Sequence, residues 1–246
     1  MLFLNTRPSP RAQELTDVLQ QHGVRTFHLP LLELVEQDLD ATLIQLYQQL
    51  AQVDVIVVVS PTAVQVGMRY LTQLKLNLPQ VKWIAVGEKT ALELKKYDID
   101  AQVPELETSE GMLQIPYLKQ LLTGSKIAFW RGEGGRQFMM QHLQQQGMQI
   151  LNFVLYKRCC PTRTIEQIST LQLTLQQDLI QILITSEASW RNWLTLNIHL
   201  NQVEYLVLGD RLYRILEQYS QQYHVKMKLK KLTNLKPETI LHHIFE

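Results

Sequence analysis

The residues with the clearest chemical potential are short turns of hydroxyls, arginine and glycine that follow apolar runs. The run Val57–Val59 leads directly into Ser60-Pro61-Thr62, and ILI (182–184) leads into Thr185-Ser186. Helical spacing follows both. Similar turns stand at Thr6-Arg7, Gly87, Arg131-Gly132 and Gly209. Hydroxyls cap helices, glycine permits close backbone approach, and helix N-termini present unpaired N–H groups to anions. Taken together the turns predict anion binding, although each one alone is equally explained by helix capping.

Tyr156 is the candidate for proton transfer. It ends the apolar pattern QILNFVLY, and a tyrosine hydroxyl there can donate a proton or a hydrogen bond to a leaving group. An aromatic side chain packed at a domain junction explains the same position, so spacing alone leaves both interpretations open. The sequence has no HExxH, no GxSxG, no paired Cys-His spacing and no carboxylate cluster. His242-His243 indicates a surface helix and not a metal site.

The stretch RGEGGR, residues 131–136, is the most conspicuous glycine cluster. It matches neither a P-loop nor a dinucleotide fingerprint. Its two arginines suit carboxylates or phosphates, and a permissive turn with solvent-facing arginines is the other interpretation. The basic stretch KMKLKK (226–231) favours a solvated edge strand over a nucleic-acid patch, because the net charge of the chain is only +1.

Parallel sheets are the elements that bring such turns together. Strand and helix patterns alternate along the chain, and VDVIVVV and LIQILIT are almost continuously apolar, as in strands covered on both faces. Ligands of such sheets bind beyond the carboxyl ends of the strands. The predicted fold class is therefore α/β.

Three strand-turn-helix units occur twice in the same order. Gly23 and Gly147, which end helical patterns, are 124 residues apart. Ser60 and Ser186 are 126 apart, and Gly87 and Gly209 are 122 apart. This near-constant offset indicates a duplicated architecture.

We therefore predict two parallel-sheet α/β domains joined by a two-stranded β ladder, with an active-site cleft between them. Residues 1–30 and 161–246 form the first domain, and residues 39–150 form an inserted second domain. Residues 31–38 and 151–160, which are extended and of mixed polarity, form the connecting ladder and act as a hinge.

Composition narrows the classes of protein. The chain has 246 residues, 46% of them hydrophobic and 19% charged. The start lacks the pattern of a signal peptide, and no apolar run reaches about 18 residues. The adjacent Cys159 and Cys160 indicate reduced thiols. We expect a cytoplasmic protein that binds no membrane and no nucleic acid.

The sequence resembles the uroporphyrinogen-III synthase family. The matching pieces are LNTRP, HGVRTFHLPLLEL, VVSPTAV, WIAVGEKTALEL, TSEGML, RGEGGR, QQQGMQILNFVLYKR and LITSEASW, in family order from residue 2 to about 194. Each motif is loose, but their order and spacing together are specific. The resemblance implies the fold predicted above, with the active site in the cleft.

The resemblance also implies a reaction, that of a cofactor-free hydro-lyase of tetrapyrrole (heme) biosynthesis. The substrate hydroxymethylbilane loses its ring-A hydroxyl as water. The resulting azafulvenium is attacked at the substituted carbon of ring D, and a spiro intermediate then gives uroporphyrinogen III with ring D inverted. Without enzyme the bilane closes to isomer I, so catalysis is mainly control of geometry.

Carried onto this chain, the family's catalytic tyrosine falls on Tyr156. The family's Ser-Pro turn falls on Ser60-Pro61, its Gly-x-x-Thr on Gly87 and Thr90, and its second-half hydroxyl turn on Thr185-Ser186. Together with the turns at the other strand ends, the predicted substrate-binding residues are Thr6, Arg7, Ser60, Thr62, Gly87, Thr90, Ser109, Arg131, Gly132, Thr185, Ser186 and Gly209. The chain departs from the family at a second Gly-x-x-Thr, where Leu212 replaces the threonine. Arg211 is a hypothetical substitute anion donor there.

The implied substrate is a linear tetrapyrrole with eight carboxylates, and no metal or cofactor is expected. A monomer in transient contact with hydroxymethylbilane synthase is expected as well. Two other classes stay open: a non-catalytic two-domain protein that binds an anionic ligand, and a glycosyltransferase-like enzyme. Turnover of the bilane without added cofactor or metal separates these classes.

Overall fold

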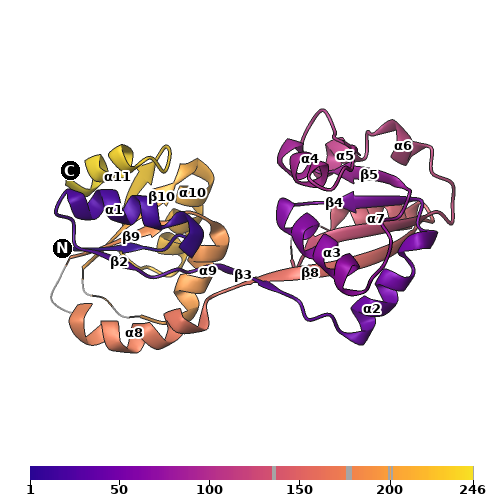
Figure 1. The fold of residues 1–246 in the computed structure, drawn as a ribbon. Coiled ribbons are helices and arrows are strands. Elements are labelled where there is room, and N and C mark those ends of the chain that lie inside the picture. Colours follow the sequence, from indigo (N-terminus) through magenta and orange to yellow (C-terminus); the bar gives the residue numbers. More distant parts are fainter. Residues whose placement is uncertain (135–136, 176–178, 199, 201, 246) are drawn as a thin grey trace. The chain divides into compact units, whose positions relative to one another are not determined.

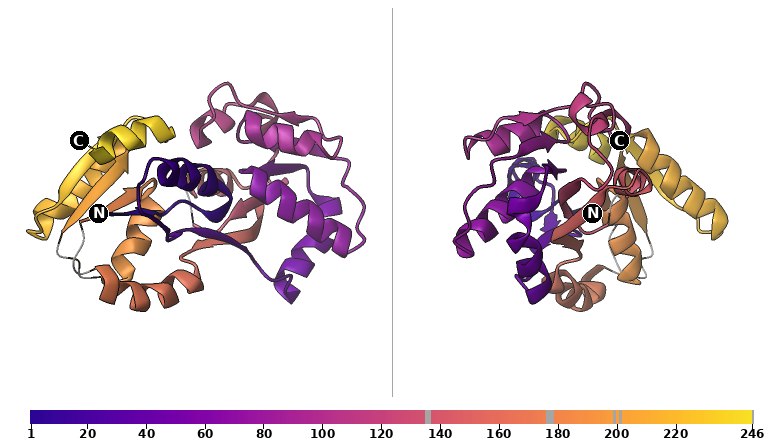
Figure 2. Two further views of the ribbon diagram at one scale, coloured as in Figure 1. Left: turned by 60° about the vertical axis from the view of Figure 1, so that its left-hand side comes forward. Right: turned by 90° about the vertical axis from the view of Figure 1, so that its right-hand side faces the viewer.

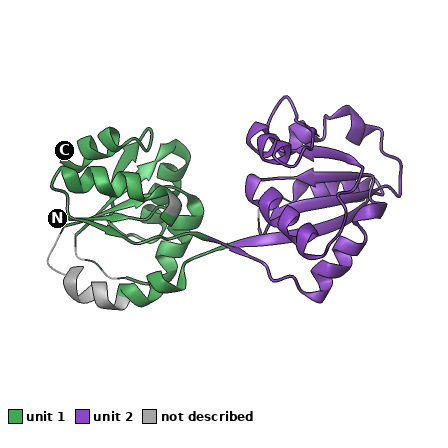
Figure 3. Ribbon diagram, viewed as in Figure 1, with its two compact units in different colours: residues 1–33, 158–246 green, residues 34–157 purple. Residues whose placement is uncertain are grey.

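The computed structural model describes residues 1–134, 137–175, 179–198, 200 and 202–245. Two compact units divide the chain: unit 1 comprises residues 1–33 and 158–246, and unit 2 comprises residues 34–157 (Figure 3). The boundaries fall inside strands β3 (Glu33–Glu36) and β8 (Gln149–Cys159). Strands β3 and β8, which contain parts of the predicted ladder segments, are neighbours in the unit 2 sheet.

Unit 1 contains a five-stranded parallel sheet in the order β11-β10-β9-β1-β2. Its strands are β1 (Leu2–Asn5), β2 (Thr26–His28), β9 (Ile180–Ile184), β10 (Val203–Leu208) and β11 (Lys228–Leu232). Every residue of β1 and β9 is buried. The apolar run that predicted a covered strand is thus the centre of the sheet. The basic stretch forms β11 at the sheet edge, as predicted.

Helices cover both faces of this sheet. One face packs against α1 (Gln13–Gln21) and α11 (Pro237–Phe245), through residues such as Leu15 and Ile240. The other packs against α8 (Thr162–Leu175), α9 (Glu187–Thr195) and α10 (Gly209–Gln222). A short 3-10 helix, η1 (Ser9–Arg11), precedes α1. Figure 2 shows the indigo N-terminal and yellow C-terminal segments in this same unit.

Unit 2 contains a six-stranded sheet in the order β3-β8-β7-β4-β5-β6. The further strands are β4 (Val55–Val58), β5 (Lys82–Ala85), β6 (Ala101–Gln102) and β7 (Lys126–Gly132). Pairing is parallel from β8 to β6. The four residues of β4 are fully buried, so the valine run lies at the centre of this sheet.

The unit 2 sheet is also covered on both faces (Figure 1). One face packs against α2 (Ala41–Gln48), η2 (Leu50–Gln52), α3 (Pro61–Gln73) and α4 (Glu88–Lys95). The other packs against α5 (Ser109–Met112), α6 (Pro116–Lys119) and α7 (Phe138–Gln145). Among the described residues of both units, no helix is long and apolar enough to cross a membrane.

The two sheets share one spatial order of strands. In unit 1 the order is β2-β1-β9-β10-β11, and its counterpart in unit 2 is β8-β7-β4-β5-β6. Gly23 and Gly147, which follow the corresponding helices α1 and α7, have positive φ of 75° and 84°. The duplicated architecture and the parallel α/β fold predicted from the sequence are thus confirmed. The chain order differs, because β1-α1-β2 begins unit 1 whereas β7-α7-β8 ends unit 2.

Candidate active site

Each sheet has one point where the chain reverses its direction of progress across the strands. In unit 1 this switch point lies between β1 and β9, and in unit 2 it lies between β4 and β7. Ligands of open α/β sheets bind beyond the carboxyl ends of strands at such points. Thr6-Arg7 and Thr185-Ser186 follow the two strands in unit 1. In unit 2, Ser60-Pro61-Thr62 comes after β4, and Arg131-Gly132 are the last two residues of β7. Most of the predicted turns therefore flank a switch point.

Ser60 and Tyr156 meet at the carboxyl edge of the unit 2 sheet. Ser60 is the N-cap of α3, and its Oγ accepts a hydrogen bond of 3.1 Å from the backbone N–H of Ala63. The same Oγ lies 3.0 Å from the hydroxyl oxygen of Tyr156, and either oxygen can be the donor. Pro61 occupies the first turn of α3, where its missing N–H costs nothing. The turn that the sequence singled out thus caps a helix and contacts the proposed acid.

Gly132 makes room for the tyrosine. A Cβ on Gly132 would lie 2.5 Å from Cζ of Tyr156, so only glycine lets the ring pack so close to this backbone. The β7–β8 pairing is irregular at this place, between Arg131 and Gly132, and brings Gly132 opposite Tyr156. Tyr156 is 2% exposed. The strand irregularity and the glycine together fix the direction of its ring.

Arg131 is turned into its own loop. Its guanidinium donates from Nε to the Gly132 carbonyl at 3.1 Å and from Nη2 to the Gly134 carbonyl. Burial lowers the pKa of Arg131. In this conformation Arg131 braces the glycine loop. Gly135 and Arg136, the rest of the predicted anion-binding turn, lie outside the described residues.

The N-terminus of α4 at Gly87 already holds a carboxylate. Glu107 accepts a hydrogen bond of 2.7 Å from the Glu88 backbone N–H. A Cβ on Gly87 would lie 2.3 Å from the carboxyl carbon of Glu107, so glycine makes space for this group. Thr90, one turn further, is buried. Glu107 was not expected from the sequence, because it lies in an exposed stretch without periodicity.

Ser109 is the first residue of α5, but the capping hydroxyl is that of its neighbour. Thr108 Oγ1 accepts from the Gly111 N–H at 3.0 Å. Adjacent hydroxyls give equal signals for an N-cap, so the sequence could not distinguish Thr108 from Ser109. Thr62 is half-buried in the first turn of α3.

In unit 1, Thr6 is buried and donates its hydroxyl hydrogen to the Leu183 carbonyl, which ties the ends of β1 and β9 together. The Asn5 carboxamide oxygen accepts from the Arg7 N–H at 3.3 Å and shapes this turn. The guanidinium of Arg7 makes no hydrogen bond or ion pair with any described residue. Partial burial and then the neighbouring Arg11 lower its pKa. Two guanidiniums at one strand end create a positive potential suited to anions.

Ser186 caps α9 as Ser60 caps α3. Its Oγ accepts from the Ser189 N–H at 3.1 Å and also contacts the Ser189 hydroxyl. Thr185, just before it, is half-buried. The capping role predicted for this turn is the role that the structure shows.

The Gly209 turn differs from its counterpart at Gly87. Gly209 has φ of +76°, so its backbone conformation requires glycine. Leu212, which stands where the family has threonine, is buried in the core beside α9 and α10. Arg211 pairs with Glu187 at 3.2 Å, so its charge is partly compensated within the chain.

No group of three or more metal-ligating side chains occurs in the part of the chain that the structure describes. Cys159 and Cys160 are half-buried, and neither forms a disulfide within the described chain. Burial raises the pKa of Cys160, with Cys159 and Glu33 adding to the effect, so this thiol is not an activated nucleophile. The chemistry available at the site is that of hydroxyls, backbone N–H groups and arginines.

Comparison with known proteins agrees with this picture. The family model described as Uroporphyrinogen-III synthase HemD matches residues 13–227. The uroporphyrinogen-III synthase of Proteus mirabilis is 30% identical over 161 residues, which cover 64% of this chain and 80% of that protein. That of Salmonella typhimurium is 32% identical over 162 residues, which cover 65% of each chain. The aligned part thus spans slightly less than two thirds of the Salmonella protein.

Solved structures resemble this chain over nearly its whole length. A mutant uroporphyrinogen III synthase from Thermus thermophilus aligns with a TM-score of 0.62 and 16% identity, covering 99% of this chain and 97% of that one. The enzyme named uroporphyrinogen-III synthetase from Helicobacter pylori aligns with a TM-score of 0.57 and 15% identity, with the same coverage. At such identities the likeness concerns the fold.

Proposed function

Because this chain belongs to the uroporphyrinogen-III synthase family, we propose that it cyclises hydroxymethylbilane to uroporphyrinogen III. The reaction eliminates water, inverts ring D and needs no cofactor. The observation that carries the catalytic part is the 3.0 Å contact between Ser60 Oγ and Tyr156 Oη at the carboxyl edge of the unit 2 sheet. It supports Tyr156 as the acid that assists departure of the ring-A hydroxyl.

The hydrogen bonds around Ser60 suit transfer of a proton from Tyr156 to the leaving hydroxyl. Ser60 Oγ already accepts from the Ala63 N–H, so its own hydrogen is available to Tyr156 Oη. In this proposal the phenol hydrogen passes to the leaving hydroxyl. The C–O bond breaks with both electrons on oxygen, water departs, and an azafulvenium cation is left. The phenolate is stabilised by Ser60 and by the positive end of α3, and it regains its proton when closure of the macrocycle releases one.

The other turns bind the carboxylates of the substrate in this proposal. Arg7 offers a guanidinium, and the turns at Ser60 and Ser186 offer hydroxyls and backbone N–H groups. Such donors let a chain of net charge +1 bind a polyanion. The proposal includes a cytoplasmic monomer that receives the bilane during transient contact with hydroxymethylbilane synthase.

An isomer assay tests the proposed reaction. Freshly prepared hydroxymethylbilane is supplied to the full chain without cofactor or metal, and the oxidised type I and type III uroporphyrins are separated by chromatography. A dominant type III product above the spontaneous background is expected. Type I alone, formed at the spontaneous rate, would contradict the proposed activity. Tight binding of the bilane in that case would favour the non-catalytic anion-binding protein.

The variant Tyr156→Phe tests the acid. Its ring still packs on Gly132, while the hydroxyl is absent, so initial turnover should fall by about 100-fold, the low end of general acid catalysis. Tyr117→Phe is the matched control, because it removes a tyrosine hydroxyl that bonds only the Asp54 carbonyl. Equal turnover of the two variants would remove Tyr156 from the mechanism and leave the isomer assay untouched.

A further inference from the structure

Unit 2 contains a cavity on the side covered by α5, α6 and α7. Its volume is about 530 Å³, within the range of small-molecule sites. No residue of the candidate active site lines it. The lining consists of Glu110, Leu113, Gln114, Leu118, Lys119, Leu121, Thr123, Phe138, His142, Leu143, Gln146 and Met148.

One wall of the cavity is a stripe along α7. Phe138, His142 and Gln146 are spaced four residues apart, so their side chains lie on one face of the helix. The rings of Phe138 and His142 are stacked, with centroids 6.0 Å apart and planes at 29°. Phe138 is 46% exposed. A stacked aromatic pair at an open wall is a platform for another flat ring.

Hydrogen bonding orients the imidazole in this wall. The Gln146 side-chain nitrogen lies 3.2 Å from His142 Nε2. In the tautomer in which Nε2 accepts a hydrogen from this carboxamide, Nδ1 carries the ring hydrogen. His142 therefore keeps an N–H donor for another group.

The rest of the lining is apolar with one cation. Leucines from α5, α6 and the segment after them, together with Leu143 and Met148, supply the apolar surface. The ammonium of Lys119 makes no ion pair or hydrogen bond with any described residue, so it is available to an anion. Glu110 also lines the cavity and would repel a second negative charge.

From this complementarity we propose that the cavity is a second ligand site, which binds a small aromatic molecule carrying a single carboxylate. The aromatic body stacks on the Phe138–His142 pair and covers the leucines. The carboxylate accepts hydrogen bonds from Lys119 and from an N–H of His142. This inference does not depend on the proposed reaction, because the two sets of residues are separate.

The test uses 2-naphthoate as the probe and its neutral amide, 2-naphthamide, as the comparison, titrated calorimetrically into the full chain. One equivalent of 2-naphthoate should bind. Lys119→Ala should weaken 2-naphthoate about tenfold and 2-naphthamide less than twofold, because only the charged hydrogen bond is lost. Lys82→Ala, an exposed lysine outside the lining, should change neither affinity.

A pair of tryptophan variants on one helix turn tests the location. Gln146→Trp should fill the cavity and abolish binding of both probes, whereas Gln144→Trp, exposed but outside the lining, should not. Circular dichroism melting confirms that both variants fold. Binding that survives Gln146→Trp and Lys119→Ala but is lost in Arg7→Ala would place the probe at the candidate active site and overturn the proposal. Absence of stoichiometric binding would overturn it too.

Discussion

Ser186 in unit 1 and Ser60 in unit 2 cap corresponding helices with hydrogen bonds of equal length, 3.1 Å. Their second partners differ. Ser60 Oγ contacts the hydroxyl of Tyr156, whereas Ser186 Oγ contacts the hydroxyl of Ser189 in its own helix. At the offset of 124 residues, the position matching Tyr156 in unit 1 is occupied by Leu32. In unit 2 the capping serine thus contacts a tyrosine of another strand, whereas in unit 1 it contacts only its own helix among the described residues.

Arg7 and Arg131, at the carboxyl ends of the corresponding strands β1 and β7, also differ between the units. Arg131 in unit 2 is buried and donates to carbonyls of its own loop. Arg7 in unit 1 is half-buried beside Arg11 and keeps its donors for other groups. The two sheets therefore have corresponding carboxyl edges that carry different residues. We assign proton transfer to unit 2 and anion recognition mainly to unit 1.

The cores have diverged in a compensating way. In unit 2 the strand carries a large residue, Trp130, and helix α3 carries Gly67 against it. The positions matching these in unit 1 are Thr6 on the strand side and Trp193 on helix α9. In unit 2 the large residue is thus on the strand and the small one on the helix, whereas at the matching positions of unit 1 the helix carries the large residue. Close packing demands that volume added at one position be removed at another.

Gly67→Ala should produce the largest effect on stability. An added Cβ would lie 2.2 Å from the ring of the fully buried Trp130, and the resulting overpacking should cost about 2 kcal/mol net. The sign of the change in unfolding free energy is informative, because replacing glycine by alanine in an uncrowded helix would instead stabilise the protein by about 1 kcal/mol. Urea unfolding measures the difference. Gln73→Ala, an exposed position in α3, should stay within about 0.5 kcal/mol of the wild type.

Ser60→Ala and Ser186→Ala test the divergence of the caps. Both should lose about 1 kcal/mol of stability, because each removes an N-cap acceptor. Only Ser60→Ala should lower kcat, by about tenfold, since it alone disconnects Tyr156. Ser186→Ala should act through KM. Ser60→Thr, which retains a hydroxyl, should restore most of the turnover. Equal kcat values for the two alanine variants would mean that the contact with Tyr156 is only structural.

Gly87 and Gly209 occupy corresponding turns but should respond differently to alanine. Gly209→Ala forces a side chain into a left-handed conformation, φ +76°, and should cost about 1 kcal/mol. Gly87 is extended, and its added Cβ would meet only the end of the flexible Glu107 side chain. Gly87→Ala should lower the free energy of unfolding by about 0.5 kcal/mol. This loss should vanish when Glu107 is also replaced by alanine. A double-mutant cycle by thermal melting measures this coupling.

Local patterns were enough to predict much of the fold. The apolar runs are the central strands β4 and β9, Ser60 and Ser186 are N-caps, and the lysine-rich stretch is an edge strand. These features follow from spacing within one element, which a sequence displays directly. The repeated offsets extended the same reasoning to the duplicated architecture of the two units.

Contacts between distant residues were beyond such patterns. Ser60 and Tyr156 are 96 residues apart and meet only because the sheet order brings β4 and β8 to either side of β7. The direction of Arg131 depends on loop backbone carbonyls, and Glu107 caps α4 from an exposed loop. Sequence periodicity predicts which face of an element is buried but not where a long side chain or a loop carboxylate ends.

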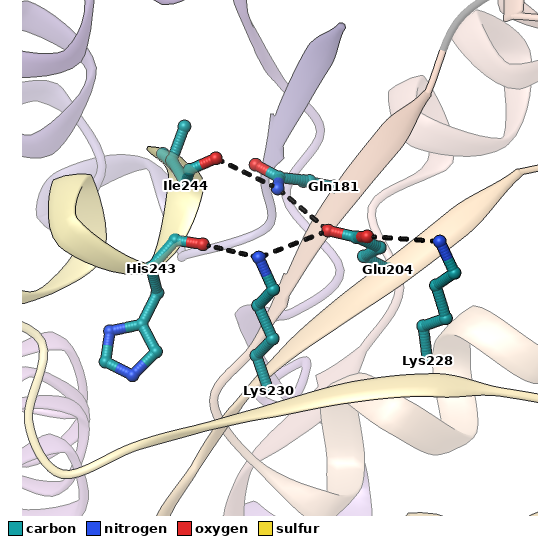
Figure 4. Close-up of polar contacts among 6 residues, drawn as sticks. All are labelled: Gln181, Glu204, Lys228, Lys230, His243 and Ile244. Atoms are coloured by element: carbon teal, nitrogen blue, oxygen red, sulfur yellow. Dashed lines mark hydrogen bonds and ion pairs between the residues drawn. The ribbon is translucent and has the colours of Figure 1, made fainter. Parts of the chain in front are cut away.

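The outer strands of the two sheets show a last divergence. The edge strand of the unit 1 sheet is β11, with five residues, whereas the corresponding edge strand of the unit 2 sheet is β6, with two. Around β11, Glu204 of β10 accepts from Gln181 at 3.0 Å and lies 3.5 Å from the ammonium groups of both Lys228 and Lys230 (Figure 4). Lys230 also donates to the carbonyl of His243, near the end of α11. The position matching Glu204 in unit 2 is the exposed Lys82.

Glu204→Gln should give the smallest effect, and one that depends on pH. Burial of Glu204 opposes its ionisation, but the Gln181 hydrogen bond and the two lysines outweigh burial and lower its pKa. A carboxyl with a depressed folded-state pKa stabilises the fold above its unfolded pKa and loses this contribution as pH falls through the folded value. The variant should therefore be less stable at pH 7, by about 0.5 kcal/mol, and this difference should shrink as the pH falls below 4.5, the ordinary pKa of a glutamate.

High salt should shrink the same difference, because the lysines are partly exposed and screened. Glu217→Gln, an exposed residue of α10, controls for the loss of one negative charge and should show no such dependence on pH. A difference that persists unchanged at pH 3 would show that Glu204 contributes through packing and not through its charge. Unit 1 would then hold its longer edge strand by burial alone.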